Sequence, residues 1–73
     1  MSQRFTAIIE RGEVGYVALC PELDVASQGD TVAGARANLR EAIELLLETA
    51  SKEEIARRLS GEVYVTQIEV VSA

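Results

Sequence analysis

An amphipathic helix near the middle of the chain constrains the fold more than any other feature of the sequence. Its apolar side chains recur at helical spacing and are Val32, Ala35, Leu39, Ile43 and Leu46. A stripe of this width covers one face of a helix and has to be buried against another element. Asp30 or Thr31 can cap the first turn, because a short side chain with an oxygen accepts from the free N–H groups there. The pattern predicts one long helix packed on one face of a sheet.

Three short strands are predicted before this helix. Residues 4–10 alternate, with Phe5, Ala7 and Ile9 on one side, and residues 16–20 are apolar on both sides. The two glycines within residues 11–15 favour a hairpin with a bulge or a residue at positive φ. Pro21 cannot donate to a strand ladder. The second strand should therefore end near residue 20, and residues 25–28 should form a third strand at an edge.

A short helix and a fourth strand are predicted after the long helix. Residues 51–54 have the spacing of a capping box, and Gly61 should stop the helix that they begin. Residues 63–71 are rich in β-branched side chains and are predicted to be a strand. A right-handed crossover places this strand beside the first. The expected fold of residues 1–73 is one α+β domain, β-β-β-α-(short α)-β, with a four-stranded mixed sheet in the order 3-2-1-4.

Self-association is expected because little else can reinforce so small a core. The chain has 73 residues, one cysteine and no histidine, so an intrachain disulfide and a typical zinc site are excluded. The predicted strands carry apolar side chains on both faces of the sheet, whereas the strands of a sheet with one solvated face alternate between apolar and polar residues. We expect a dimer or a tetramer. The residues expected to take part are Phe5, Ile9, Leu45, Leu47 and Tyr64.

The charge of the chain favours a basic partner. Seven basic residues against twelve acidic ones give a net charge of −5, which argues against a nucleic-acid surface. The first residues, MSQRFTAIIERGE, have too short an apolar run for the central region of a signal peptide, and no stretch approaches the roughly 20 apolar residues of a membrane span. We expect a cytoplasmic protein without a membrane partner.

Residues 20–31, CPELDVASQGDT, hold the residues that invite a catalytic interpretation. Cys20 has no histidine to activate it, so a buried cysteine at a strand end is the better interpretation. Glu22 and Asp24 are more typical of a turn than of an acid/base pair, with contact to a basic partner ranking between the two. No catalytic residue, metal site or cofactor is predicted. The candidate partner-binding residues are Glu22, Leu23 and Asp24 on the turn and Glu41, Glu44 and Glu48 along the helix, although such an acidic stripe is usually a solvated face.

Residues 15–48, GYVALCPELDVASQGDTVAGARANLREAIELLLE, together with FTAIIE at residues 5–10, resemble the HicB-like antitoxin family of bacterial type II toxin-antitoxin systems. The resemblance implies a degraded ribonuclease H-like half. The sequence does not support enzymatic activity of that fold, because the strand positions where such nucleases carry metal-binding carboxylates are apolar here. The resemblance also implies that the protein binds and silences HicA, a small basic ribonuclease.

Two features depart from the family pattern. Many members continue into a C-terminal DNA-binding module, whereas this chain stops at Ala73, so direct DNA binding is not expected. Gly34 stands where members often have an acidic residue, either to permit close packing or because it is merely tolerated. A different hypothesis is a stand-alone structural or small-ligand-binding homo-oligomer that has no toxin partner.

Overall fold

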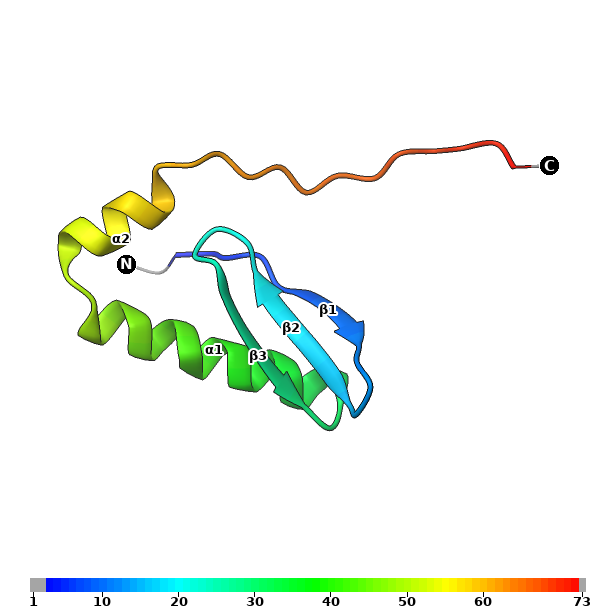
Figure 1. The fold of residues 1–73 in the computed structure, drawn as a ribbon, viewed down its shortest axis with the longest axis horizontal. Coiled ribbons are helices and arrows are strands. Elements are labelled where there is room, and N and C mark those ends of the chain that lie inside the picture. Colours follow the sequence, from blue (N-terminus) through cyan, green and yellow to red (C-terminus); the bar gives the residue numbers. More distant parts are fainter. Residues whose placement is uncertain (1–2, 73) are drawn as a thin grey trace.

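The computed structural model describes residues 3–72, which form three strands followed by two helices (Figure 1). The elements are β1 (Ile8–Arg11), β2 (Tyr16–Cys20), β3 (Val25–Gly29), α1 (Val32–Thr49) and α2 (Lys52–Leu59). The strands form one antiparallel sheet in the order β1-β2-β3. Helix α1 packs on one face of this sheet, mainly against β3 and β2. The second strand, the third strand at an edge and both helices are confirmed.

The prediction of a four-stranded sheet is wrong. Residues 62–72, which we call the C-terminal arm, form no strand and run clear of the sheet as the orange and red trace in Figure 1. Their large apolar side chains are exposed, from 44% at Val63 to 94% at Val71. A β-branched composition suits a pleated, half-buried surface, but it makes a strand only where an edge pairs with it. The arm meets no such edge within its own chain, so the order 3-2-1-4 is replaced by a three-stranded antiparallel meander.

Strand β1 is also shorter than predicted and begins at Ile8 rather than Arg4. Ile8 pairs with Leu19, and the same register brings Thr6 opposite Pro21, which has no N–H to offer. Proline therefore removes the donor that the Thr6 carbonyl would need, whereas the N–H of Thr6 is satisfied by a side chain, the carboxylate of Glu22. It accepts hydrogen bonds from the backbone N–H of Thr6, at 3.0 and 3.1 Å, and from the Thr6 hydroxyl. A side chain therefore replaces the strand ladder here.

The core lies between α1 and the sheet. Its fully buried residues are Ala18, Cys20, Leu23, Ala35 and Leu39. Phe5, Ile9, Ile43 and Leu46 are partly buried and pack around them. The predicted apolar stripe is thus confirmed from residue 35 onward. Val32 is 49% exposed, because the helix first meets the sheet one turn later, at Ala35.

The start of α1 approaches the end of β3 at backbone distance. A Cβ atom on Gly29 would lie 2.5 Å from the backbone nitrogen of Ala35 and 2.7 Å from the carbonyl carbon of Gly34. On the other side of the same strand end, Gly15 has a φ of 75°, and a Cβ there would lie 2.4 Å from the carbonyl oxygen of Gly29. The predicted hairpin residue at positive φ is confirmed. The β1–β2 turn, the end of β3 and the start of α1 are therefore packed together by their backbones.

Thr31, not Asp30, caps α1. Its hydroxyl accepts a hydrogen bond from the N–H of Gly34 at 2.9 Å. A Cβ on Gly34 would lie only 3.1 Å from that hydroxyl oxygen, so glycine keeps the cap uncrowded. The close contact that glycine avoids at position 34 is therefore with the capping hydroxyl of Thr31, at the start of the same helix.

Helix α2 is tied to the β2–β3 turn by one arginine. Ser51 caps the helix by accepting from the N–H of Glu54 at 3.1 Å, which confirms one half of the predicted capping box. Arg58 Nη1 donates to the carbonyl oxygen of Leu23 at 2.6 Å, and its Nε donates to Glu54 at 3.1 Å.

Within residues 3–72, no helix has the length and apolar character that crossing a membrane requires.

The backbone contact of Gly29 can be tested by adding one methyl group. Gly29→Ala should lower the free energy of unfolding by about 1–3 kcal/mol, because the new methyl group overlaps the backbone of α1. Gly61→Ala is the matched control: nothing lies within 4 Å of its added Cβ, so its effect should stay within about 1 kcal/mol. Urea unfolding followed by far-UV circular dichroism measures both. Equal stability of the two variants would contradict the close approach.

Candidate functional site

The β2–β3 turn, predicted as a partner contact, contributes mainly to the fold. Leu23 is fully buried, and its carbonyl oxygen is the acceptor for Arg58. The carboxylate of Glu22 is engaged by Thr6 and also accepts from Cys20 Sγ at 3.4 Å. Asp24 is exposed and adopts a φ of 55°, a left-handed conformation that aspartate tolerates in turns. Of the three predicted residues, only Asp24 extends into solvent.

The hydrogen bonds of Glu22 change its titration. Partial desolvation raises its pKa, but the Thr6 hydroxyl, the N–H groups of Glu22 and Thr6, and the Cys20 thiol favour the charged form. Their combined effect holds the pKa of Glu22 below its ordinary value of 4.5. The carboxylate is therefore ionised at neutral pH and acts as a structural acceptor rather than as an acid.

Glu22→Gln should lower the free energy of unfolding by about 1 kcal/mol at neutral pH, because the amide replaces an ionised acceptor with a neutral one. The pKa of Glu22 is lower in the folded protein than in the unfolded chain, so its stabilisation is complete above pH 4.5 and is lost as the pH falls through the folded-state pKa. The difference in the free energy of unfolding between the parent protein and the variant should accordingly become smaller below that pH. Denaturant titrations at several pH values measure it. A gap that stays constant on acidification would show that the charge of Glu22 is not involved, and the exposed Glu13→Gln variant serves as the control.

Cys20 is the one cysteine of the sequence and the nucleophile considered above, and its thiol is buried. Burial is the largest cause that raises the pKa of Cys20, and it outweighs the N–H of Leu23, which lowers it. The hydrogen bond to Glu22 and the negative charge of that carboxylate raise the pKa further. The thiol stays protonated at neutral pH, so the structure favours a core cysteine over a reactive one.

The thiol of Cys20 should react with a disulfide reagent such as DTNB only when the protein opens. At mildly alkaline pH we expect labelling of the native protein to be slower than labelling in denaturant by a factor of about 10² or more, since both burial and protonation suppress the thiolate. Absorbance of the released thionitrobenzoate follows the reaction. Native labelling at the denatured rate would mean that Cys20 is an accessible thiol.

The exposed side of α1 carries an acidic face, formed by Glu41, Glu44, Leu45 and Glu48. These positions lie within one third of the helical circumference and point away from the sheet. Glu44 pairs with Arg40 at 3.7 Å, but both side chains are well exposed, so the pair contributes little. Leu45 is 59% exposed among the three carboxylates. The predicted acidic stripe therefore borders an apolar contact point, Leu45.

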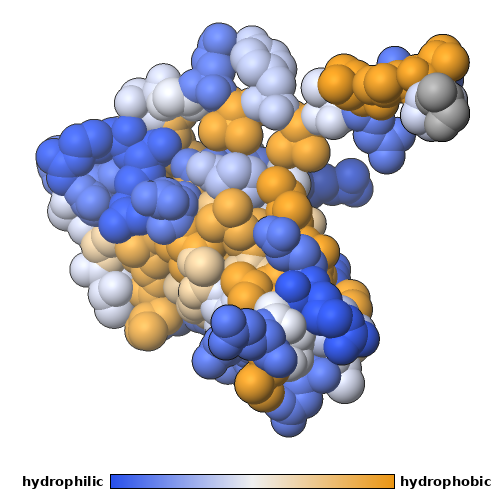
Figure 2. All heavy atoms as spheres, turned by 45° about the vertical axis from the view of Figure 1, so that its right-hand side comes forward, coloured by the Kyte–Doolittle hydropathy of each residue, from blue (hydrophilic) through white to orange (hydrophobic). Residues whose placement is uncertain are grey.

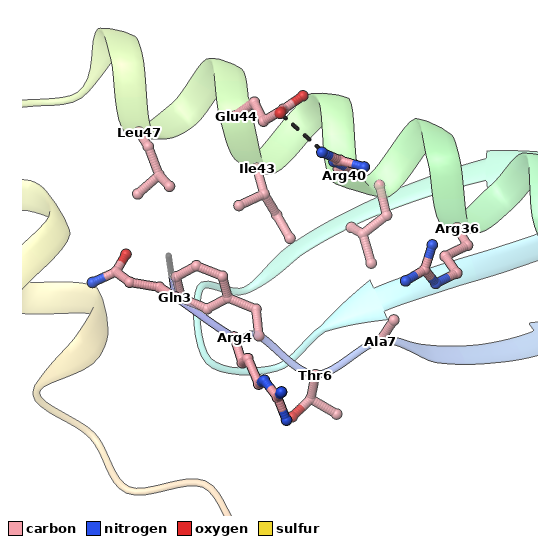
Figure 3. A pocket seen from close by; sticks show the side chains of 11 residues that line it. Gln3, Arg4, Thr6, Ala7, Arg36, Arg40, Ile43, Glu44 and Leu47 are labelled. Carbon is pink, nitrogen blue, oxygen red and sulfur yellow. Dashed lines mark ion pairs between the residues drawn. The ribbon is translucent and has the colours of Figure 1, made fainter. Parts of the chain in front are cut away.

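A groove of about 650 Å³ opens on another side of the same helix, between α1 and residues 3–7 (Figure 3). We call it the α1 groove. Its apolar floor consists of Phe5, Leu39, Ile43 and Leu47. In Figure 3, Ile43 and Leu47 project from the helix towards residues 3–7. Its polar lining includes Arg4, Arg36 and Arg40. Across residues 3–72, neither Arg4 nor Arg36 forms an ion pair.

The α1 groove brings together only some of the residues predicted for self-association. Phe5 and Leu47 line it, whereas Leu45 lies on the acidic face, Ile9 packs against the core and Tyr64 is on the arm. Self-association itself stays a prediction. Sequence reasoning missed the arginines of the groove. Their signal was the spacing of Arg36 and Arg40, which are four residues apart and flank the apolar stripe of the helix.

The fold and these two surfaces define a small α+β domain with an acidic helix face and an arginine-lined groove. Within residues 3–72 there is no group of three His, Cys, Asp or Glu side chains placed to hold a metal ion.

The chain is 48% identical over 64 residues to the UPF0150 protein ssl0738 of Synechocystis sp. (strain ATCC 27184 / PCC 6803 / Kazusa), an alignment that covers 85% of this chain and 88% of that protein. The protein belongs to the UPF0150 family. No family model and no solved structure matches it.

Proposed function

We propose that the protein is a HicB-like antitoxin that binds a small basic ribonuclease of the HicA type and neutralises it by covering its active surface. Three observations support this proposal. The chain belongs to UPF0150, residues 15–48 resemble HicB-like proteins, and the net charge is −5. The protein acts in this proposal by binding alone and not as an enzyme.

The acidic face of α1 is the observation that carries the proposal. Its three carboxylates project into solvent from one rigid helix, so a cationic partner meets them without rearrangement of the fold. Opposite charges accelerate the encounter, and burial of Leu45 at the edge of the acidic face prolongs the complex. A ribonuclease carries basic residues where it holds the phosphates of RNA. The acidic face can therefore compete with RNA for the same surface.

The non-enzymatic part of the proposal is supported by the state of the candidate groups. Cys20 is buried with a raised pKa, and the carboxylate of Glu22 is held by Thr6. The excess of negative charge also leaves operator DNA outside the proposal.

Co-expression tests the function directly. A neighbouring reading frame that encodes a basic protein of similar size should be toxic alone, and growth should recover when this chain is produced with it. The two proteins should also co-purify. Persistent toxicity without co-purification would refute the antitoxin function and favour a stand-alone oligomer.

The acidic face can be tested by reversing one charge. Glu48→Lys should slow association with the toxin about threefold to tenfold and reduce its salt dependence, because the residue contributes to electrostatic steering. Glu13→Lys is the matched control, since it makes the same change of net charge at an exposed site on the β1–β2 turn. Surface plasmon resonance at several salt concentrations measures both. Equal slowing by the two variants would assign the effect to net charge and remove the acidic face from the interface.

A further inference from the structure

The C-terminal arm exposes more apolar surface than a segment in water normally does. Tyr64 is 81% exposed, Ile68 83% and Val70 74%. Figure 2 shows the arm as a separate projection that carries hydrophobic side chains, drawn in orange. Its backbone is extended and unpaired, so its N–H and C=O groups are free to pair with another chain. Such a segment is suited to strand-like docking on a partner.

The α1 groove complements the arm in apolar surface and in charge. It offers an apolar floor, and three arginines line it against one carboxylate, that of Glu44. The arm contributes the opposite charge, because residues 62–72 contain Glu62 and Glu69 and no basic residue. In a chain with a net charge of −5, this arginine-lined groove is a site where an acidic segment meets attraction instead of repulsion.

The groove also lies next to an unpaired strand edge. Strand β1 pairs with β2 on one side only, and residues 3–7 continue it along the groove. The N–H of Thr6 is directed to Glu22 on the β2 side. Alternate residues of an extended chain direct their N–H groups to opposite sides, so those of Phe5 and Ala7 face outward. An extended peptide lying here finds backbone partners as well as an apolar floor.

We propose that two copies of the protein exchange arms, so that residues 62–72 of each copy lie in the α1 groove of the other. The arm runs clear of its own sheet (Figure 1). Its apolar side chains and the groove of the same chain are therefore both uncovered. Eleven extended residues reach about 36 Å, ample to follow the groove of a neighbour. Tyr64, Ile68 and Val70 share one side of the extended arm and lie on the floor. Because a two-fold axis relates the two copies, the same contact between arm and groove forms twice.

Three single substitutions test the exchange by analytical ultracentrifugation. The parent protein should sediment as a dimer. Ile68→Arg in the arm and Leu47→Arg in the groove should each weaken dimerisation at least about tenfold, because each places a charge on apolar surface beside the arginines. Val14→Arg is the control for the arm, since Val14 on the β1–β2 turn is 85% exposed against 83% for Ile68. It should remain dimeric.

Mixing the two monomeric variants separates arm exchange from other dimers. The arm of the Leu47→Arg chain and the groove of the Ile68→Arg chain are both intact, so an equimolar mixture should form a one-to-one complex through a single contact. The mixture is titrated up to about 10⁴-fold above the dissociation constant of the parent dimer, since loss of the second, linked contact weakens the complex by about 10²–10⁴. Each variant alone at the same concentrations is the reference.

Several outcomes would overturn the exchange. A monomeric parent protein is one, and a mixture that stays monomeric is another. A dimeric Leu47→Arg variant would indicate pairing between arms, and a dimeric Ile68→Arg variant would indicate another interface. Far-UV circular dichroism verifies that each variant is folded. Arg36→Glu, at an exposed site, is the second groove variant and should weaken the dimer without disturbing the core. A dimer of undiminished affinity in this variant would contradict the charge complementarity.

Discussion

The close approach of α1 to the end of β3 is the contact on which the rest of the structure depends. Gly29 lets the backbones of strand and helix touch at Ala35, and Thr31 caps the helix within the same turn. The direction of α1 is thereby set at its first turn. Leu39, one turn further along, then meets the buried side chains of the sheet. A larger residue at position 29 would move the whole helix outward and open this small core.

The surfaces available for function follow from the lengths of the elements. The 18 residues of α1 rise about 27 Å, whereas strands of four and five residues reach about 13–17 Å. The helix is therefore longer than the sheet beneath it. It is only partly covered and presents the α1 groove along residues 36–47 on one side and the acidic face along residues 41–48 on another. One element thus supplies the groove proposed for a second copy and the acidic face proposed for a basic partner, and the two surfaces adjoin at Glu44.

Local sequence signals predicted much of this fold and little of the site. Strand β2, both caps and the glycine at positive φ depend on neighbouring residues, so short patterns were sufficient. The role of Glu22 depends on Thr6, which lies 16 positions away, and no short pattern encodes that distance. The residues of the arm have strand propensity, but propensity does not specify which edge a strand will meet. The groove escaped prediction for the same reason, since it joins residues 3–7 to α1.

The central claim is that a second copy covers the surfaces that one chain leaves open. Hydrogen exchange of the backbone amides of residues 63–71, measured over a range of protein concentrations, tests it most directly. The account predicts slow exchange at high concentration, where the arms are docked, and a return towards the unprotected rate on dilution, as the dimer dissociates. Exchange at the rate of an unstructured peptide at every concentration would contradict it.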